Sequence, residues 1–211
     1  MHKKEAMNRK QIILTLLMFT STAWAGPFED ADAAHSRKDY AEAVRLYKQA
    51  AVNEDRISQY NRAHIAISQY NLGQMYREGQ GVVKDYSEAA KWYKLAAVQG
   101  LPNAQYNLGQ MYIKGQGVLE DYSEGAKWNK LAAAQGNANA QYSLGLMFST
   151  GLGVPVNDVR AHMWFNLAAV QGHAGAAKAR EAANSEMTPQ QRGEAQKLAK
   201  ECLARNFKGC D

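Results

Sequence analysis

The chain has 211 residues, of which 46% are hydrophobic and 21% are charged, and this length allows one elongated domain or one to two compact domains. Ala, Gly and Gln are prominent, and small residues at regular intervals favour close helix–helix packing over a β-sandwich. Of the formal net charge of +5, the first 25 residues supply four basic residues and one acidic residue, which leaves +2 for the rest. The remaining Lys and Arg alternate with Asp and Glu, so the composition argues against nucleic-acid binding.

The N-terminal segment has the layout of a secretory signal peptide. A basic stretch precedes an apolar run over residues 12–19, and Ala23-Trp24-Ala25 provides a small-x-small cleavage site. The apolar run is shorter than the roughly 20 residues that a membrane-spanning helix needs. We therefore expect cleavage after Ala25, a mature protein that is periplasmic or secreted, and no stable membrane insertion.

A repeat of 36 residues dominates the remainder of the chain. The motif Gln-Tyr-x-Leu-Gly begins at residues 69, 105 and 141, and a Gly-x-Gly motif and a Trp recur at the same interval. Residues 69–104 and 105–140 are identical at 27 of 36 positions, and 105–140 and 141–176 at 16. Such self-similarity is typical of solenoids, in which stacked units bury the apolar faces that one unit cannot bury alone.

Each repeat is predicted to form two antiparallel helices, helix A and helix B. In the middle repeat, Leu108 and Met111 share one face of helix A. Gly109 lies inside that helix at a cost of about 1 kcal/mol relative to Ala, which predicts a close backbone approach there. Gly115 ends helix A, since glycine adopts the left-handed C-cap conformation, and Asp121 begins helix B as an N-cap. In the third repeat Asn157 replaces this aspartate, so a weaker helix start is expected there.

The flanks extend the same architecture. Residues 31–52 resemble another helix pair, and an insertion of ten residues follows, in which residues 58–61 and 68–71 look like a local duplication. We expect the insertion to lengthen a helix or the preceding loop. The array is assigned to residues 26–187, and a C-terminal capping helix and disulfide loop to residues 188–211. Thr188, Pro189 and Gln191 predict the start of that last helix.

Two cysteines, Cys202 and Cys210, lie at the C-terminus of what we expect to be an exported chain. An even pair in an oxidising compartment indicates a disulfide. Eight residues of unbroken helix would separate them by about 12 Å, whereas a disulfide tolerates a Cα separation of roughly 4.4–6.8 Å. The helix must therefore end between them, and Asn206 and Gly209 are the residues able to reverse the chain.

The pattern A-x-x-x-L-G-x-x-Y, G-x-G-V, D-x-x-x-A-x-x-W, A-A-x-x-G resembles the Sel-one-like repeat, a relative of the tetratricopeptide repeat. The resemblance is strong over residues 69–176 and weaker in the flanks. It implies an all-α, right-handed superhelical solenoid of antiparallel helix pairs, with a concave surface that holds other proteins. Exported relatives that are rich in cysteine are associated with β-lactam binding or hydrolysis, so the resemblance also implies this activity. This chain lacks the cysteine pair that those relatives carry in each repeat.

Residue patterns that would support catalysis or metal binding are missing from the sequence. There is no Ser-x-x-Lys with Lys-Thr-Gly, and Ser87 and Ser123 precede lysines by four residues in the manner of an ordinary helix start. The histidines have no metal-ligand spacing, and the Gly-x-Gly motifs follow no strand. The repeating Trp92, Trp128 and Trp164 are expected to pack between helices. We expect no enzyme activity, no cofactor and no metal.

The remaining candidate surface is the face of helix A that points away from helix B. In each repeat, three positions at i, i+3 and i+7 share this face, and in tetratricopeptide-like arrays it lines the concave groove. We call these nine residues the helix-A face: Asn71, Gln74, Glu78, Asn107, Gln110, Lys114, Ser143, Leu146 and Thr150. Uncharged amides there suit hydrogen bonding to an extended peptide, although an ordinary solvated face would have a similar composition.

The predicted function is therefore an exported, monomeric repeat scaffold that binds a protein or peptide partner. Two alternatives remain open: a binder or hydrolase of β-lactams or cell-wall peptides, and a secreted effector that binds a host protein.

Overall fold

The computed structural model describes residues 26–52 and 59–210, and within these ranges it contains ten α-helices and no β-strand. The expected signal peptide with its cleavage after Ala25 lies outside the described residues, as does Ser58 of the apparent duplication. The helices are α2 (Pro27–Ser36), α3 (Tyr40–Ala51), α4 (Gln59–Glu78), α5 (Tyr86–Val98), α6 (Pro102–Lys114), α7 (Tyr122–Ala133), α8 (Ala138–Thr150), α9 (Asp158–Val170), α10 (Ala176–Glu186) and α11 (Pro189–Ala204).

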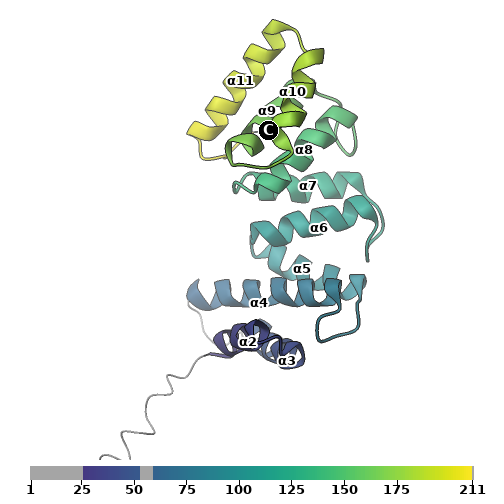
Figure 1. Ribbon diagram of the computed structural model, residues 1–211, viewed down its shortest axis with the longest axis vertical. Coiled ribbons are helices and arrows are strands. Elements are labelled where there is room, and N and C mark those ends of the chain that lie inside the picture. Colours follow the sequence, from purple (N-terminus) through teal and green to yellow (C-terminus); the bar gives the residue numbers. More distant parts are fainter. Residues whose placement is uncertain (1–25, 53–58, 211) are drawn as a thin grey trace, which may run out of the picture.

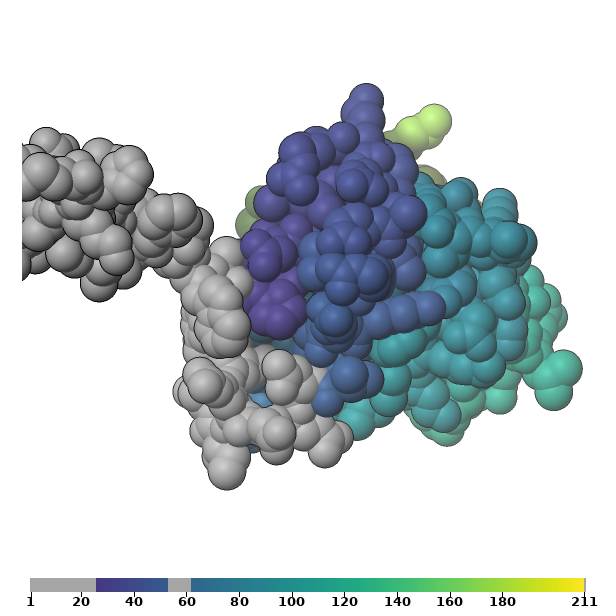
Figure 2. Space-filling model, turned by 90° about the horizontal axis from the view of Figure 1, so that it is seen from below, coloured from purple at the N-terminus to yellow at the C-terminus, as the bar shows by residue number. Residues whose placement is uncertain are grey.

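Consecutive helices pack as hairpins, and the hairpins stack into an elongated array (Figure 1). The pairs are α2–α3, α4–α5, α6–α7 and α8–α9, and each helix B also packs on the next helix A. Seen from the N-terminal end, residues 26–52 lie in front of the rest of the array (Figure 2). The prediction of an all-α repeat solenoid is confirmed. No helix in the described ranges is both long and apolar enough to cross a membrane.

Helix B begins at a side-chain N-cap in each regular repeat. Asp85 accepts from the backbone N–H groups of residues 87 and 88, and Asp121 from that of Glu124. Asn157 keeps the equivalent bond, to Arg160 N at 2.9 Å, the same length as the Asp121 bond. The third helix start therefore keeps the capping hydrogen bond. It replaces the acidic N-cap with an amide and the following glutamate with Arg160, and it retains one acidic residue, Asp158, in the first turn, which favours the positive end of the helix dipole.

The Gly-x-Gly segment both ends helix A and contacts the preceding repeat. Gly115 is the left-handed C-cap of α6, with φ of 61°, as expected. Gly117, also at positive φ, lies against the backbone of Tyr86 and Ser87, so a Cβ at this position would come closer than 3.0 Å to those atoms. Gly117 therefore has two reasons to be glycine: its left-handed conformation and the seam between two repeats.

The glycine inside helix A makes room for helix B. A Cβ on Gly109 would lie 3.1 Å from the carbonyl oxygen of Gly125 and 3.1 Å from Nδ2 of Asn129. The backbone approach predicted for Gly109 is therefore present. At Gly73 the equivalent space is filled by the ring of Tyr93, 2.6 Å from where a Cβ would be.

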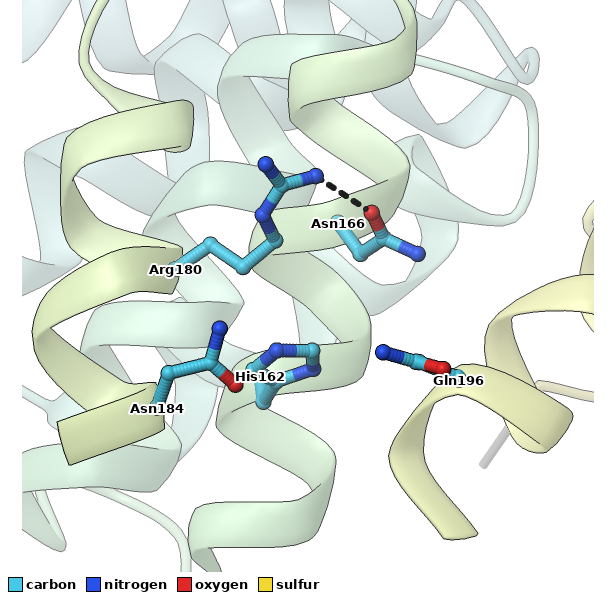
Figure 3. A pocket seen from close by; sticks show the side chains of 5 residues that line it. All are labelled: His162, Asn166, Arg180, Asn184 and Gln196. Carbon is cyan, nitrogen blue, oxygen red and sulfur yellow. Dashed lines mark hydrogen bonds between the residues drawn. The ribbon is translucent and has the colours of Figure 1, made fainter. Parts of the chain in front are cut away.

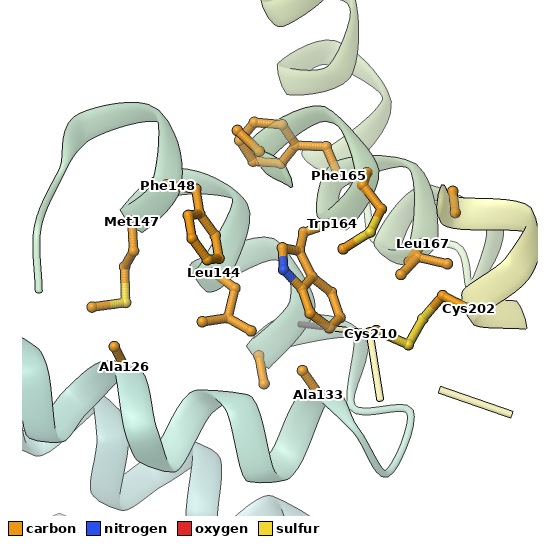
Figure 4. Packing of buried hydrophobic residues seen from close by; sticks show 14 of the residues in the cluster. Ala126, Ala133, Leu144, Met147, Phe148, Trp164, Phe165, Leu167, Cys202 and Cys210 are labelled. Carbon is orange, nitrogen blue, oxygen red and sulfur yellow. A yellow bond between two sulfur atoms is a disulfide. The ribbon is translucent and has the colours of Figure 1, made fainter. Parts of the chain in front are cut away.

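The aromatic packing differs in part from the expectation. Trp164 is 2% exposed and lies in the core among residues of α8 and of the C-terminal loop (Figure 4), but Trp92 and Trp128 are only partly buried. The position after the tryptophan is the one buried in every repeat, and it is Tyr93, Asn129 and Phe165 in turn. Helix B is rotated so that this next position meets the glycine of helix A, and Trp164 is enclosed by residues of α8 together with the C-terminal segment.

The ten-residue insertion lengthens a helix. Helix α4 has 20 residues, whereas α6 and α8 have 13 each. The extra residues extend its N-terminal end toward α3. This outcome selects the first of the two expected possibilities for the insertion.

The C-terminal end does not continue the pattern of hairpins, because α10 and α11 both pack on α9. Helix α11 begins with the predicted capping box of Thr188 and Gln191. Cys202 and Cys210 lie at disulfide-bonding distance with Cα atoms 5.3 Å apart, and the chain reverses through Asn206 and Gly209, both at positive φ as expected, and Phe207. Both cysteines are buried beside Ala133 and Leu167 (Figure 4), so the loop closes the end of the core.

Candidate functional site

The inner row of the helix-A face consists of Asn71, Asn107 and Ser143, which are half-buried between repeats. Burial raises the pKa of Tyr70, and a hydrogen bond from Asn107 is among the contacts that oppose this rise. Ser143 acts in the same direction on Tyr106, whose pKa is also raised by burial. These polar groups therefore contact tyrosines of the repeat before them and contribute to stacking.

The middle row consists of Gln74, Gln110 and Leu146. Gln74 donates to the hydroxyl of Tyr70 over 2.9 Å, and Gln110 donates to Oγ of Ser143 over 3.1 Å. Leu146 is 41% exposed and stands where the two preceding repeats have glutamine. The structure thus joins the middle row to the inner row at Gln110 and Ser143 and leaves Leu146 partly exposed to solvent.

The outer row consists of Glu78, Lys114 and Thr150, and all three residues are exposed. Glu78 pairs with Arg77 over 2.7 Å, and Thr150 donates its hydroxyl hydrogen to the carbonyl of Leu146 over 2.8 Å. The outer row therefore presents a carboxylate, an ammonium group and a hydroxyl at successive repeats.

A ladder of buried glutamines joins the repeats and was not predicted from the sequence. Gln69, Gln105 and Gln141, which open the repeated motif, are at most 6% exposed. Each donates from Nε2 to a carbonyl at the end of the preceding helix B, over 3.1 to 3.3 Å, and accepts from a glutamine 30 residues later. The carbonyls of Ala97 and Ala133 also accept from the backbone N–H groups of Gly100 and Gly136, so the ladder adds a second hydrogen bond at these helix ends and links each repeat to the one before it. The recurrence of Gln at 36-residue intervals was the signal available in the sequence.

The serines considered for catalysis lie at helix starts. The backbone N–H of Ser87 donates to the N-cap Asp85 over 2.8 Å. The lysines four residues after Ser87 and Ser123 pair instead with glutamates, Lys91 with Glu88 and Lys127 with Glu124, each over 2.5 Å. These lysines are thus ion-paired in the manner of an exposed i,i+3 pair. Among the described residues, no group of three or more His, Cys, Asp or Glu side chains could hold a metal ion.

Comparison with known proteins places these features in a family. The Sel1 repeat model matches residues 34–51, 66–101, 102–137 and 138–173, more than half of the chain. Its repeats begin three residues before ours, which is a choice of starting point within the same 36-residue period. A search of curated proteins finds no match.

Solved structures show the same fold. A Sel1 repeat protein from Oxalobacter formigenes is 34% identical, with a TM-score of 0.56, and the match covers 66% of this chain and 97% of the other. A protective antigen of uropathogenic Escherichia coli strains that displays an SLR fold is 23% identical, with a TM-score of 0.65. That match covers 94% of this chain and 45% of the antigen, so the chain spans less than half of the antigen's length. On the four matched repeats and the shared solenoid, the chain belongs to the Sel1 repeat family.

Proposed function

We propose that this protein is an exported scaffold that binds a protein or peptide partner along the concave side of the array, through the helix-A face. Sel1 repeats generally serve as protein–protein interaction scaffolds. The observation that carries the proposal is the position of Leu146, a 41% exposed leucine in the middle row, where the two preceding repeats have glutamine. An apolar anchor surrounded by hydrogen-bonding groups is the usual composition of a peptide-binding surface.

The rows suit an extended ligand. The amides of Gln74 and Gln110 already have partners, but each carries further donor and acceptor capacity. The carboxylate of Glu78 is already paired with Arg77 over 2.7 Å, whereas Lys114 is exposed one repeat later. We therefore infer a partner segment with an apolar side chain for Leu146 and an acidic group for Lys114.

The experiment is site-specific photo-crosslinking in intact cells. A photoreactive amino acid replaces Leu146 in one strain and Leu131 in another. Leu131 on α7 is a matched control, because it is also a leucine and is 50% exposed but lies on a helix B. We expect a defined crosslinked partner from position 146 and little from position 131. Equal crosslinking from the two positions would refute the assignment of the face.

Export is tested in the same strains. Fractions of periplasm and culture supernatant are probed for the chain, and the mass of the mature protein is measured to locate the cleavage. A periplasmic product that begins after Ala25 is expected for a resident scaffold. Accumulation in the supernatant would favour the released effector, and turnover of a chromogenic β-lactam by the purified protein would favour the hydrolase.

A further inference from the structure

A polar cavity of about 320 Å³, lined by none of the residues of the helix-A face, lies at the C-terminal end of the array; Figure 3 shows its lining residues. It forms where α10 and α11 both pack on α9. Its lining is His162, Asn166, Arg180, Asn184 and Gln196, which come from all three helices. Gln196 is exposed, so the cavity opens to solvent on the α11 side. This volume is at the lower end of the range of small-molecule sites.

His162 lies at the base of this cavity. His162 is 1% exposed, and neither nitrogen of its ring makes a hydrogen bond of ordinary geometry. The same holds for Oδ1 of Asn184, which lies beside the ring (Figure 3). Buried polar groups without partners cost free energy and are rare in folded proteins. Such a set around one cavity therefore indicates groups that a ligand would satisfy.

The histidine is not required by the repeat. The equivalent positions in the two preceding repeats are Ala90 and Ala126, and both are buried. Asn166 likewise stands where the earlier repeats have Lys94 and Lys130. The third repeat thus departs from its own pattern at the two positions of α9 that line the cavity.

The electrostatics of the cavity are positive. Arg180 donates from Nη1 to Oδ1 of Asn166 over 2.9 Å, and this is its one hydrogen bond among the described residues. Arg192 is held nearby by the backbone carbonyls of Asn184 and Met187, and no acidic residue lines the cavity. A lysine at position 166 would have repelled Arg180, whereas the amide orients it.

The protonation state of His162 agrees with this charge. Burial is the largest cause that lowers the pKa of the imidazole, and the positive charge of Arg180 comes next. The hydrogen-bonding contact with Asn184 opposes them, and the charge of Arg192 lowers the pKa by a smaller amount. The ring is therefore neutral near pH 7 and offers one N–H donor and one acceptor.

From this geometry we propose that the cavity binds a small carboxylate. The free N–H groups of the Arg180 guanidinium match the planar oxygens of a carboxylate, and His162, Asn184 and Gln196 supply uncharged donors. Of the described side chains that line the cavity, Arg180 is the one that is charged, since the guanidinium of Arg192 is bound to the backbone carbonyls of Asn184 and Met187, so a single guanidinium would contact the ligand and suits a single negative charge. The carboxylate belongs either to a free organic acid or to the C-terminus of a peptide, and both sources share this chemistry.

The test is NMR titration of the full mature protein at pH 7.5, with chloride exchanged to hold the ionic strength constant. The probes are acetate, succinate, N-acetyl-trialanine with a free carboxylate, its C-terminal amide, and inorganic phosphate. We expect saturable shifts of the His162 imidazole and Asn184 amide signals with the carboxylates and none with the amide. Tighter binding of the peptide acid than of acetate would identify a peptide terminus, and binding of acetate and succinate alone would identify a free acid.

Matched variants separate the site from the general charge of the helix. Arg180→Gln is expected to weaken binding by at least about tenfold, as loss of a charge-assisted pair requires. Lys178→Gln removes the same charge from an exposed position of α10 and is expected to change affinity by less than about twofold. His162→Ala, which restores the residue of the other repeats, should keep the fold and weaken binding.

Three results would overturn the proposal. The first is the absence of a saturable shift with any carboxylate, and the second is equal binding by the Arg180→Gln and Lys178→Gln variants. The third is saturation by phosphate at concentrations where the carboxylates leave these signals unchanged.

Discussion

Replacing Gln141 with Leu tests whether the buried glutamine ladder holds the repeats together. Gln141 is fully buried, donates to the carbonyl of Ala133 over 3.2 Å and accepts from Gln171 over 2.5 Å. Leucine fills a similar volume but removes both of these hydrogen bonds, while the Ala133 carbonyl keeps the backbone N–H of Gly136 at 3.0 Å. A hydrogen bond contributes about 0.5–1.5 kcal/mol net. For the two lost bonds we therefore expect a decrease of about 1–3 kcal/mol in the free energy of unfolding.

The assay is urea denaturation followed by circular dichroism, with Gln110→Leu as the matched control. Gln110 is a glutamine of helix A that is only half-buried, and its bond to Ser143 is replaceable by water. The control should lose less than about 1 kcal/mol. Because repeats interact mainly with their neighbours, the Gln141 variant should also broaden the transition. Equal midpoints for the Gln141 variant and the unmodified protein would refute the role of the ladder.

Three further predictions follow from the C-terminal end. Trp164→Ala should lower the free energy of unfolding by about 3–5 kcal/mol. Trp128→Ala should lower it distinctly less, because Trp128 is only partly buried whereas Trp164 is buried. Equal urea midpoints for the two variants would contradict this packing. In protein made in the periplasm, Cys202 and Cys210 should resist alkylation under denaturing conditions without reductant, and full labelling would show that the disulfide is absent. Replacing both cysteines with Ser should lower the free energy of unfolding by about 2–3 kcal/mol. Burial and nearby positive charge lower the pKa of His162 in the folded protein, so the unfolded chain binds more protons below about pH 6.5. The free energy of unfolding should therefore decrease as the pH falls from 7.5 to 5.5, by no more than about 1.4 kcal/mol per pH unit. His162→Ala should reduce this decline, measured by urea denaturation at each pH, and an unchanged decline would assign it to other groups.

The repeat architecture was predictable because its determinants are local. N-caps such as Asp121, the C-cap Gly115 and the 36-residue interval act within one helix or between neighbours, so a linear pattern contains them. Gly109 was also predictable, since a glycine inside a helix requires a compensating contact. The candidate face was predictable as a set of positions, because helical spacing decides which residues share a side.

Other features depended on contacts that no linear pattern specifies. The insertion before residue 69 suited either a loop or a helix, and the long α4 is the outcome. The tryptophans recur at a fixed interval, but the rotation of helix B decides that Tyr93 and Phe165 are the residues buried against glycines. Trp164 is enclosed by residues of α8 together with the C-terminal segment. In each case the deciding contact comes from another helix.

The sequence by itself determined the helices, their ends and their stacking, because capping, glycine conformation and apolar periodicity are properties of short segments. Only the tertiary structure decided how the array ends. Helices α10 and α11 both pack on α9, which leaves a polar cavity between them at His162, a residue that has no metal-ligand or catalytic pattern in the sequence. The position of the cavity depends on three helices whose lining residues are separated by some 35 residues of chain. No sequence pattern predicts that these residues come together.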